Sequence, residues 1–122
     1  MNNPADNNEI FIKSRPLVSV TDFSIDEIID FIRNTLIHRG IEACYLFGSV
    51  ATGKTNPWSD IDVLIITQSS RPFIERPLDF QELFELSIPV DIIVYTSDEF
   101  EKVKRSTCGF GYDINKGMIR VL

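Results

Sequence analysis

The chain has 122 residues, of which 43% are hydrophobic, 25% are charged and 11% are aromatic, and its formal net charge is −6. This length allows one domain with a modest core, and the composition excludes a disordered chain. The acidic balance argues against a nucleic-acid partner, because general nucleic-acid binding needs a basic surface. Cys44 and Cys108 are too few for a disulfide framework, so we expect two buried thiols.

The N-terminal region shows no targeting signal. Residues 1–8 are polar and rich in asparagine, without the apolar core of a signal peptide, and no apolar run approaches the roughly 20 residues of a membrane span. A cytoplasmic protein with no membrane partner is expected. We predict an N-terminal extension, partly flexible, over residues 1–20 and a single domain over residues 21–122. Within the extension, residues 17–20 read as a short strand or an extended arm.

Capping patterns place the helices. Ser24 and Glu27 form a capping box that opens a helix, and Gly40 suits the position just after its C-terminal end. The apolar face of this helix is made by Ile25, Ile28, Ile29, Ile32 and Leu36. A second capping box at residues 96–99 opens a helix toward residue 105. We expect a short helix over residues 78–86, a helix or helical turn over residues 107–116, and core positions at Phe80, Phe84 and Phe100.

Four strands are expected, over residues 41–47, 60–67, 88–95 and 118–122. The second is continuously apolar after Asp62, which is typical of a strand covered on both faces. Pro89 favours an edge position or a strand entry for the third. The predicted fold is therefore α/β (α+β), a small mixed β-sheet with flanking helices, with no second domain.

The stretch from residue 46 to residue 66 reads as strand, glycine turn, short helix, proline turn and strand. Gly48 lets the backbone turn sharply and approach a ligand closely. The N–H groups that follow open a short helix, and a helix N-terminus attracts anions. The hydroxyl of Ser49 adds one donor, so this half of the stretch suits a phosphate.

The second half carries two carboxylates. Ten residues separate Ser49 from Asp60, and Asp62 follows two positions later. Because strand side chains alternate, Asp60 and Asp62 are expected to project from one face, where they repel each other unless a cation lies between them. Oxygen ligands of this kind suit Mg²⁺, which completes its shell with water and substrate phosphates. The stretch therefore predicts a site for a metal-bound triphosphate.

This pattern of Gly48-Ser49, ten residues and Asp60-x-Asp62 resembles the signature of the DNA polymerase β-like nucleotidyltransferase superfamily, in particular its minimal (MNT) branch. Gly53 and Ser59 also match the family pattern, and the resemblance covers roughly residues 41–122. Many members carry a basic residue, commonly arginine, between the serine and Gly53. This chain has Thr52 there, with Lys54 just beyond.

The resemblance implies roles for individual residues. Asp60 and Asp62 would hold two Mg²⁺ ions, and Asp91 would complete the catalytic metal site and help deprotonate the acceptor hydroxyl. Gly48, Ser49 and Ser59 would bind the nucleotide. Without the resemblance, Asp91 reads equally as a strand-end acid that meets solvent.

Several neighbouring residues keep two interpretations. Ser59 either orients Asp60 or caps a turn, and Trp58 is either a lid packed on the turn or a platform for a base. Single cationic residues are either solvated or contact the triphosphate or the acceptor; these are Lys54, Arg71 and Arg76. His38 is interpreted as a surface residue near a helix end.

The expected activity is Mg²⁺-dependent transfer of a nucleoside monophosphate, AMP from ATP, to a hydroxyl. The chain has no room for an acceptor-binding domain, so a partner would supply the acceptor. MNT proteins of the MntA type often pair with a HEPN-family ribonuclease toxin and act as antitoxins by transferring AMP to a toxin tyrosine. The alternative is a non-catalytic module that inhibits a partner by contact, which Thr52 favours. Transfer to a small molecule or a nucleic-acid end is a third hypothesis, and homo-oligomer formation is left open.

Overall fold

The computed structural model describes residues 16–105 and 117–122. Its helices and strands follow in the order η1 (Val20–Asp22), α2 (Ile25–Leu36), β1 (Ala43–Phe47), α3 (Gly48–Thr52), β2 (Ile61–Ile66), η2 (Phe73–Leu86), β3 (Val90–Tyr95), α4 (Ser97–Lys104) and β4 (Ile119–Arg120). The predicted α/β class is confirmed, and each strand lies within its predicted range. The helix or turn predicted over residues 107–116 lies outside the described residues, as does Cys108.

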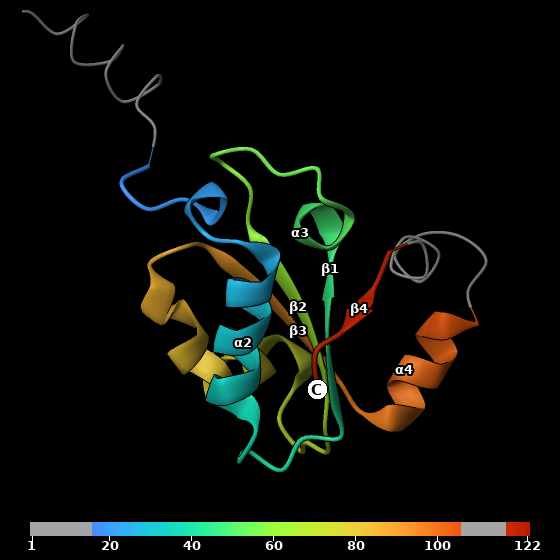
Figure 1. Ribbon diagram of the computed structural model, residues 1–122. Helices are drawn as coiled ribbons and strands as arrows, with labels where there is room; N and C mark the ends of the chain where they lie inside the picture. Colours follow the sequence, from blue (N-terminus) through green and yellow to red (C-terminus); the bar gives the residue numbers. More distant parts are fainter. Residues whose placement is uncertain (1–15, 106–116) are drawn as a thin grey trace, which may run out of the picture.

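The strands form one mixed sheet in the order β3-β2-β1-β4. Strand β1 is antiparallel to both β2 and β4, whereas β2 and β3 run parallel. Strand β3 is at the edge, which agrees with the position of Pro89 just before it. Figure 1 shows the sheet between two layers, with α2 on one side and α4 on the other.

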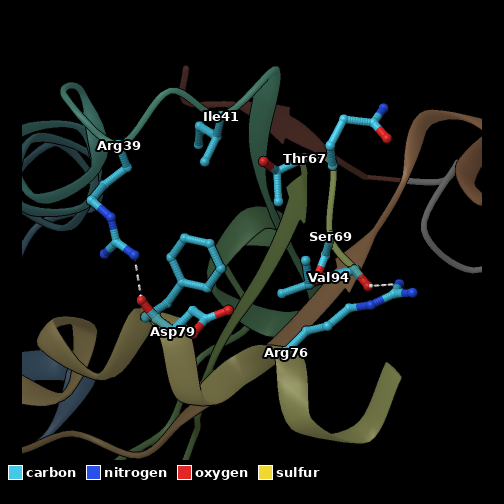
Figure 2. Close-up of a pocket in the computed structure, with 9 residues that line it drawn as sticks. Arg39, Ile41, Thr67, Ser69, Arg76, Asp79 and Val94 are labelled. Carbon is cyan, nitrogen blue, oxygen red and sulfur yellow. Dashed lines mark hydrogen bonds between the residues drawn. The ribbon is translucent and has the colours of Figure 1, made fainter. Parts of the chain in front are cut away.

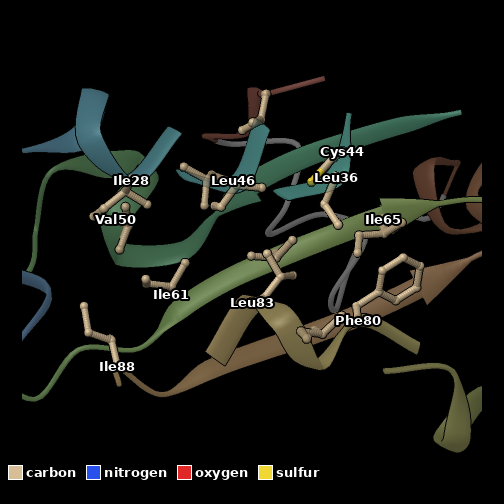
Figure 3. Close-up of a cluster of buried hydrophobic side chains, with 14 of the residues drawn as sticks. Ile28, Leu36, Cys44, Leu46, Val50, Ile61, Ile65, Phe80, Leu83 and Ile88 are labelled. Carbon is tan, nitrogen blue, oxygen red and sulfur yellow. The ribbon is translucent and has the colours of Figure 1, made fainter. Parts of the chain in front are cut away.

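Each face of the sheet has its own core. The larger core packs α2 and η2 against the sheet and includes Leu36, Leu46, Val63, Ile65 and Leu83 (Figure 3). The smaller core lies under α4 and consists of Ala43, Leu64, Ile66 and Phe100. Strand β2 supplies alternate side chains to both cores, so the prediction that it is covered on both faces is confirmed.

The two predicted capping boxes are present. The Ser24 hydroxyl accepts a hydrogen bond from the Glu27 N–H at 3.1 Å, and the Glu27 carboxylate accepts one from the Ser24 N–H at 2.8 Å. Thr96 and Glu99 make the same pair of bonds at the start of α4. Because these side chains satisfy N–H groups that have no partner within a helix, they fix where α2 and α4 begin.

Element η2 differs most from its prediction. It begins at Phe73, five residues earlier than expected, and it is a 3₁₀ segment with a kink at Phe80, where φ is −127°. Pro77 lies inside it and lacks the N–H that a regular α-helix would use. The prediction that Phe84 is a core residue was wrong, since Phe84 is 45% exposed, whereas Phe80 and Phe100 are buried as predicted.

The arm before α2 is packed against the domain. It is not a strand, and it leads into η1, whose N-cap is Ser19. Ser19 and Val20 are both buried, and Val20 belongs to the larger core. The domain boundary near residue 20 stays a prediction. Within the two described ranges, none of the helices has the length and apolar character needed for a bilayer crossing.

Candidate active site

Phe47, Asp62 and Asp91 lie in one row across the sheet. Phe47 is opposite Asp62 in the antiparallel pair of β1 and β2, and Asp62 is opposite Asp91 in the parallel pair of β2 and β3. Side chains of directly opposed residues share a face of the sheet, so the two carboxylates project to the same side. Asp60 immediately precedes β2. The sheet therefore brings the three predicted acids together where β2 and β3 begin.

The electrostatics of Asp62 reflect this gathering of charge. Burial, together with the negative charges of Asp91 and Asp60, raises the pKa of the Asp62 carboxyl to about 6. A hydrogen bond shared with Asp91 acts in the same direction. Asp91 itself is exposed on the edge strand. The centre therefore has one half-buried carboxyl beside a carboxylate that solvent and a second substrate can reach.

Gly48 brings the turn after β1 against this acid. Its φ is +73°, in the left-handed region that favours glycine. A Cβ atom added at Gly48 would lie 2.1 Å from Oδ2 of Asp62. The predicted glycine turn is thus present. The Asp62 side chain fills the space beside Gly48, so a residue with a Cβ atom does not fit there, which the sequence did not reveal.

Helix α3 starts at this turn and has only five residues. A helix this short has a small dipole, so the predicted anion attraction must come chiefly from individual N–H groups and from the Ser49 hydroxyl. The Thr52 hydroxyl donates back to the Gly48 carbonyl oxygen at 3.2 Å. Thr52, which stands where the resemblance leads one to expect a basic residue, therefore bonds within the helix and presents no cation.

The loop before Asp60 contains a tight turn. The Ser59 hydroxyl accepts a hydrogen bond from the Asn56 N–H at 2.9 Å, and the Asn56 side-chain oxygen accepts one from the Trp58 N–H at 2.8 Å. Of the two interpretations of Ser59, the structure therefore contains the turn cap. Trp58 is 57% exposed, and its two interpretations, a lid packed on the turn or a platform for a base, both stay predictions.

The loops that lead to Asp60 and Asp91 are joined to each other. The Ile61 N–H donates to the Pro89 carbonyl oxygen at 3.0 Å. Asp60 precedes Ile61, and Asp91 lies two residues after Pro89. This backbone bond helps to fix the separation between the two acids at the edge of the centre.

The three cationic candidates differ in their exposure and in their bonding partners. Arg76 is buried; its guanidinium donates to the Glu99 carboxylate at 2.6 Å and to the Val94 carbonyl oxygen at 3.1 Å. The hypothesis that Arg76 is solvated or contacts a substrate was therefore wrong. Arg71 is partly exposed and pairs with Asp79 at 3.3 Å. Lys54 is exposed. Its backbone N–H donates to the Ser49 carbonyl oxygen at 3.0 Å, which places the Lys54 backbone beside α3.

A separate polar cavity of about 180 Å³ lies at the other end of the sheet, where β2 ends (Figure 2). Its lining includes Arg39, Thr67, Ser69 and Asp79. In Figure 2 the Arg39 guanidinium points to the Asp79 carbonyl oxygen, which accepts its hydrogen bond. Arg76 lines this cavity, but the predicted acids and nucleotide-binding residues do not, so the cavity does not form part of the acidic centre.

The acidic centre fits a divalent cation by its donor chemistry. Three carboxylates offer oxygen-only ligands, and a cation would relieve their mutual repulsion, which adds to burial in raising the Asp62 pKa. Over residues 16–105 and 117–122, no three acidic, histidine or cysteine side chains converge on a single point suited to a metal ion.

Comparison with known proteins identifies the family. The family model described as a nucleotidyltransferase domain matches residues 25–110. The chain belongs to the nucleotidyltransferase domain family. A search of curated proteins found no match to this nucleotidyltransferase domain.

Three solved structures resemble the nucleotidyltransferase domain. A toxin–antitoxin with AMP-PNP shares 20% identity at a TM-score of 0.53, covering 82% of this chain and 73% of that chain. A mutant of the toxin–antitoxin MntA–HpeT shares 19% identity at a TM-score of 0.53, with the same coverage. A protein of Sulfolobus solfataricus assigned to the nucleotidyltransferases shares 22% identity at a TM-score of 0.50, covering 65% of this chain and 76% of that chain. These likenesses confirm the predicted fold and its similarity to MntA.

Proposed function

We propose that this nucleotidyltransferase transfers a nucleoside monophosphate, AMP from ATP, to a hydroxyl on a partner protein in a Mg²⁺-dependent reaction. The partner would be a HEPN-type toxin, and the chain would act as its antitoxin in the cytoplasm. The observation that carries this proposal is the gathering of Asp60, Asp62 and Asp91 beside the Gly48 turn.

The three acids are assigned to two Mg²⁺ ions. Asp60 and Asp62 would hold the ion that accompanies the triphosphate, and Asp91 would complete the second site. When bound, the ions would stabilise the attacking and leaving oxygens of an in-line displacement at the α-phosphorus. Ser49 and Ser59 are assigned to nucleotide binding, with Ser49 donating its hydroxyl to a phosphate oxygen.

Asp91 is best placed to meet the acceptor. It is exposed and lies on the edge strand, whereas Asp62 is half-buried one strand further in. A carboxylate in this position can accept the proton that the acceptor hydroxyl loses as it attacks phosphorus. The remaining bond change is cleavage between the α-phosphorus and the bridging oxygen, with pyrophosphate as the leaving group.

The choice of ATP and of a protein acceptor is supported by the relatives. Two of the similar structures are toxin–antitoxin proteins, and one of them contains AMP-PNP. Within residues 16–105 and 117–122, Asp91 is exposed on the edge strand, so the hydroxyl of a partner can reach it.

A second candidate function is inhibition of the partner by contact alone. Thr52 favours it, since the hydroxyl that replaces the usual basic side chain bonds to the Gly48 carbonyl oxygen. In this case the acidic centre would bind nucleotide weakly or not at all.

One experiment separates these functions. The protein is incubated with Mg²⁺ and the product of the neighbouring gene, in parallel with ATP labelled on the α-phosphate and ATP labelled on the γ-phosphate. Transfer of AMP places only the α-label on the partner, and chelation of Mg²⁺ abolishes it. Inhibition of the partner without either label would support contact alone, and α-label on a small molecule or nucleic acid would identify a different acceptor.

A further inference from the structure

The arm before α2 contacts the loop that leads to Asp60. Ser19, at the end of this arm, is 1% exposed, and its hydroxyl donates to the Pro57 carbonyl oxygen at 3.1 Å. The arm also lines, with Pro57, Trp58 and Pro89, a small apolar cavity of about 110 Å³. Residues 16–20 therefore lie beside both loops that precede the acids of β2 and β3.

The hydrogen-bonding capacity of the Ser19 hydroxyl is fully used. Its oxygen accepts from the Thr21 N–H at 3.2 Å, which caps η1, and it lies 2.9 Å from the Thr21 hydroxyl. A hydroxyl has one proton to donate, and in this arrangement that proton goes to Pro57 while the Thr21 hydroxyl donates to Ser19. Because Ser19 is buried, water cannot replace the bond to Pro57 if the hydroxyl is removed.

The segment that Ser19 contacts is a hydrogen-bonded turn that ends directly before Asp60. Pro57 lies within the turn that the reciprocal bonds of Asn56 and Ser59 close, with N–H to oxygen distances of 2.9 and 3.0 Å. Asp60 follows directly and is close enough to raise the pKa of Asp62. A displacement of the turn at Pro57 would therefore move Asp60 relative to the rest of the centre.

We propose that Ser19 is a positioning residue for the acidic centre, and that its bond to Pro57 sets the place of Asp60. The proposal rests on the proposed function for its effect on catalysis. Ser19 lies outside residues 25–110, which the family model matches. The capping box that Ser19 forms with Asp22 fixes the backbone at Ser19, and so fixes the position of the Ser19 hydroxyl beside Pro57.

Fluorescence of Trp58 tests whether the bond from Ser19 to Pro57 holds the turn, and it does not depend on catalysis. Trp58 is the one tryptophan in the sequence and directly follows Pro57, so its fluorescence reports on the turn alone. In Ser19→Ala, acrylamide quenching of Trp58 should increase and its fluorescence anisotropy should fall. Ser24→Ala is the matched control, because it removes the same kind of capping serine, whose hydroxyl bonds to the Glu27 N–H at the start of α2. Unchanged Trp58 signals in folded Ser19→Ala would overturn the proposal.

The kinetics of AMP transfer test whether Ser19 positions Asp60. In the AMP transfer assay, Ser19→Ala should lower kcat by about 10- to 100-fold, the scale expected for a displaced reacting group, with a much smaller change in the KM for ATP. Ser24→Ala should keep both constants close to wild type at a temperature where all three proteins are folded. A mobile Trp58 with wild-type kcat would overturn the positioning role. If the wild-type protein transfers nothing, the proposed function fails, and the Trp58 signals alone decide whether Ser19 anchors the turn.

Discussion

Gly48 and Asp62 fit together so closely that a methyl group on Gly48 would lie 2.1 Å from Oδ2 of Asp62. Two strands meet at this contact, because Gly48 follows β1 and Asp62 lies in β2. The turn at Gly48 is proposed to bind phosphate and Asp62 is proposed to bind the metal, so the positions of these two parts of the site depend on each other.

Gly48→Ala should therefore be more destabilising than an equivalent change elsewhere. Gly40 is the matched control, since its φ is +72° and nothing lies within 4 Å of an added Cβ. The left-handed conformation alone costs about 1–2 kcal/mol for alanine, so Gly40→Ala should lower the free energy of unfolding by that amount. Gly48→Ala should lose at least about 1 kcal/mol more because of the overlap. Urea denaturation of both variants measures the difference.

The cause can be isolated with a second substitution. Asp62→Ala removes the oxygen that overlaps, so the extra cost of Gly48→Ala should shrink when both changes are combined. An equal cost of Gly48→Ala in the two backgrounds would show that the overlap is not what the glycine avoids.

The raised pKa of Asp62 predicts the pH dependence of stability in the metal-free protein. The folded protein binds the Asp62 proton up to about pH 6, whereas the ordinary value is 3.8, so the free energy of unfolding should fall as pH rises between these values. The effect is about 1–3 kcal/mol. Asp62→Asn removes this effect and should be more stable than wild type at pH 7. Asp26→Asn, at an exposed position of α2, is the control. A stability difference between wild type and Asp62→Asn that does not change with pH would contradict this.

The Arg76 and Glu99 pair should matter for stability. Hydrogen bonds from Arg76 and the Thr96 N–H hold the pKa of the Glu99 carboxyl at about 2, below its ordinary 4.5. Arg76→Met should cost about 1–3 kcal/mol, since Arg76 is buried and Glu99 is partly exposed. The difference should be full above pH 4.5 and diminish as the pH falls toward 2. Arg71→Met, which breaks an exposed pair, should cost less than about 1 kcal/mol. Thermal or urea unfolding of the two variants at several pH values tests the comparison.

Much of the fold follows from local rules. The capping boxes at Ser24 and Thr96 set the helix starts, and the continuous apolar run after Asp62 required a strand covered on both faces. The spacing from Gly48 to Asp62 predicted a turn and a strand that the structure places in contact. These features were predictable because each depends on residues close together in the sequence.

The errors concern packing between distant segments. Arg76 looked like a free cation because its partner, Glu99, is 23 residues away. Phe84 looked like a core residue, but the kink at Phe80 turns the end of η2 so that Phe84 meets solvent. The role of Ser19 was missed although Ser19 and Asp22 have capping-box spacing, because the arm was interpreted as a strand or an extended segment.

Asp91→Asn should separate nucleotide binding from transfer. Asp91 lies on β3 and the other two acids lie at β2, so its loss should leave the site for the metal-bound triphosphate largely intact. The variant should bind Mg²⁺-ATP with an affinity near wild type and lose transfer, because the acceptor hydroxyl is not deprotonated. Calorimetric titration beside the transfer assay gives both quantities. Wild-type transfer would make Asp91 a structural acid, and loss of all nucleotide binding would mean that the acids act as one site.

The most direct test of the acidic centre is the intact mass of the partner protein after incubation with Mg²⁺-ATP and either wild type or the double variant Asp60→Asn/Asp62→Asn. The asparagines keep the shape of the side chains and remove the charges that would hold the metal. Wild type should add the mass of one AMP group to the partner, and the folded double variant should add none. Addition of AMP by the double variant at the wild-type rate would contradict the assignment of the site.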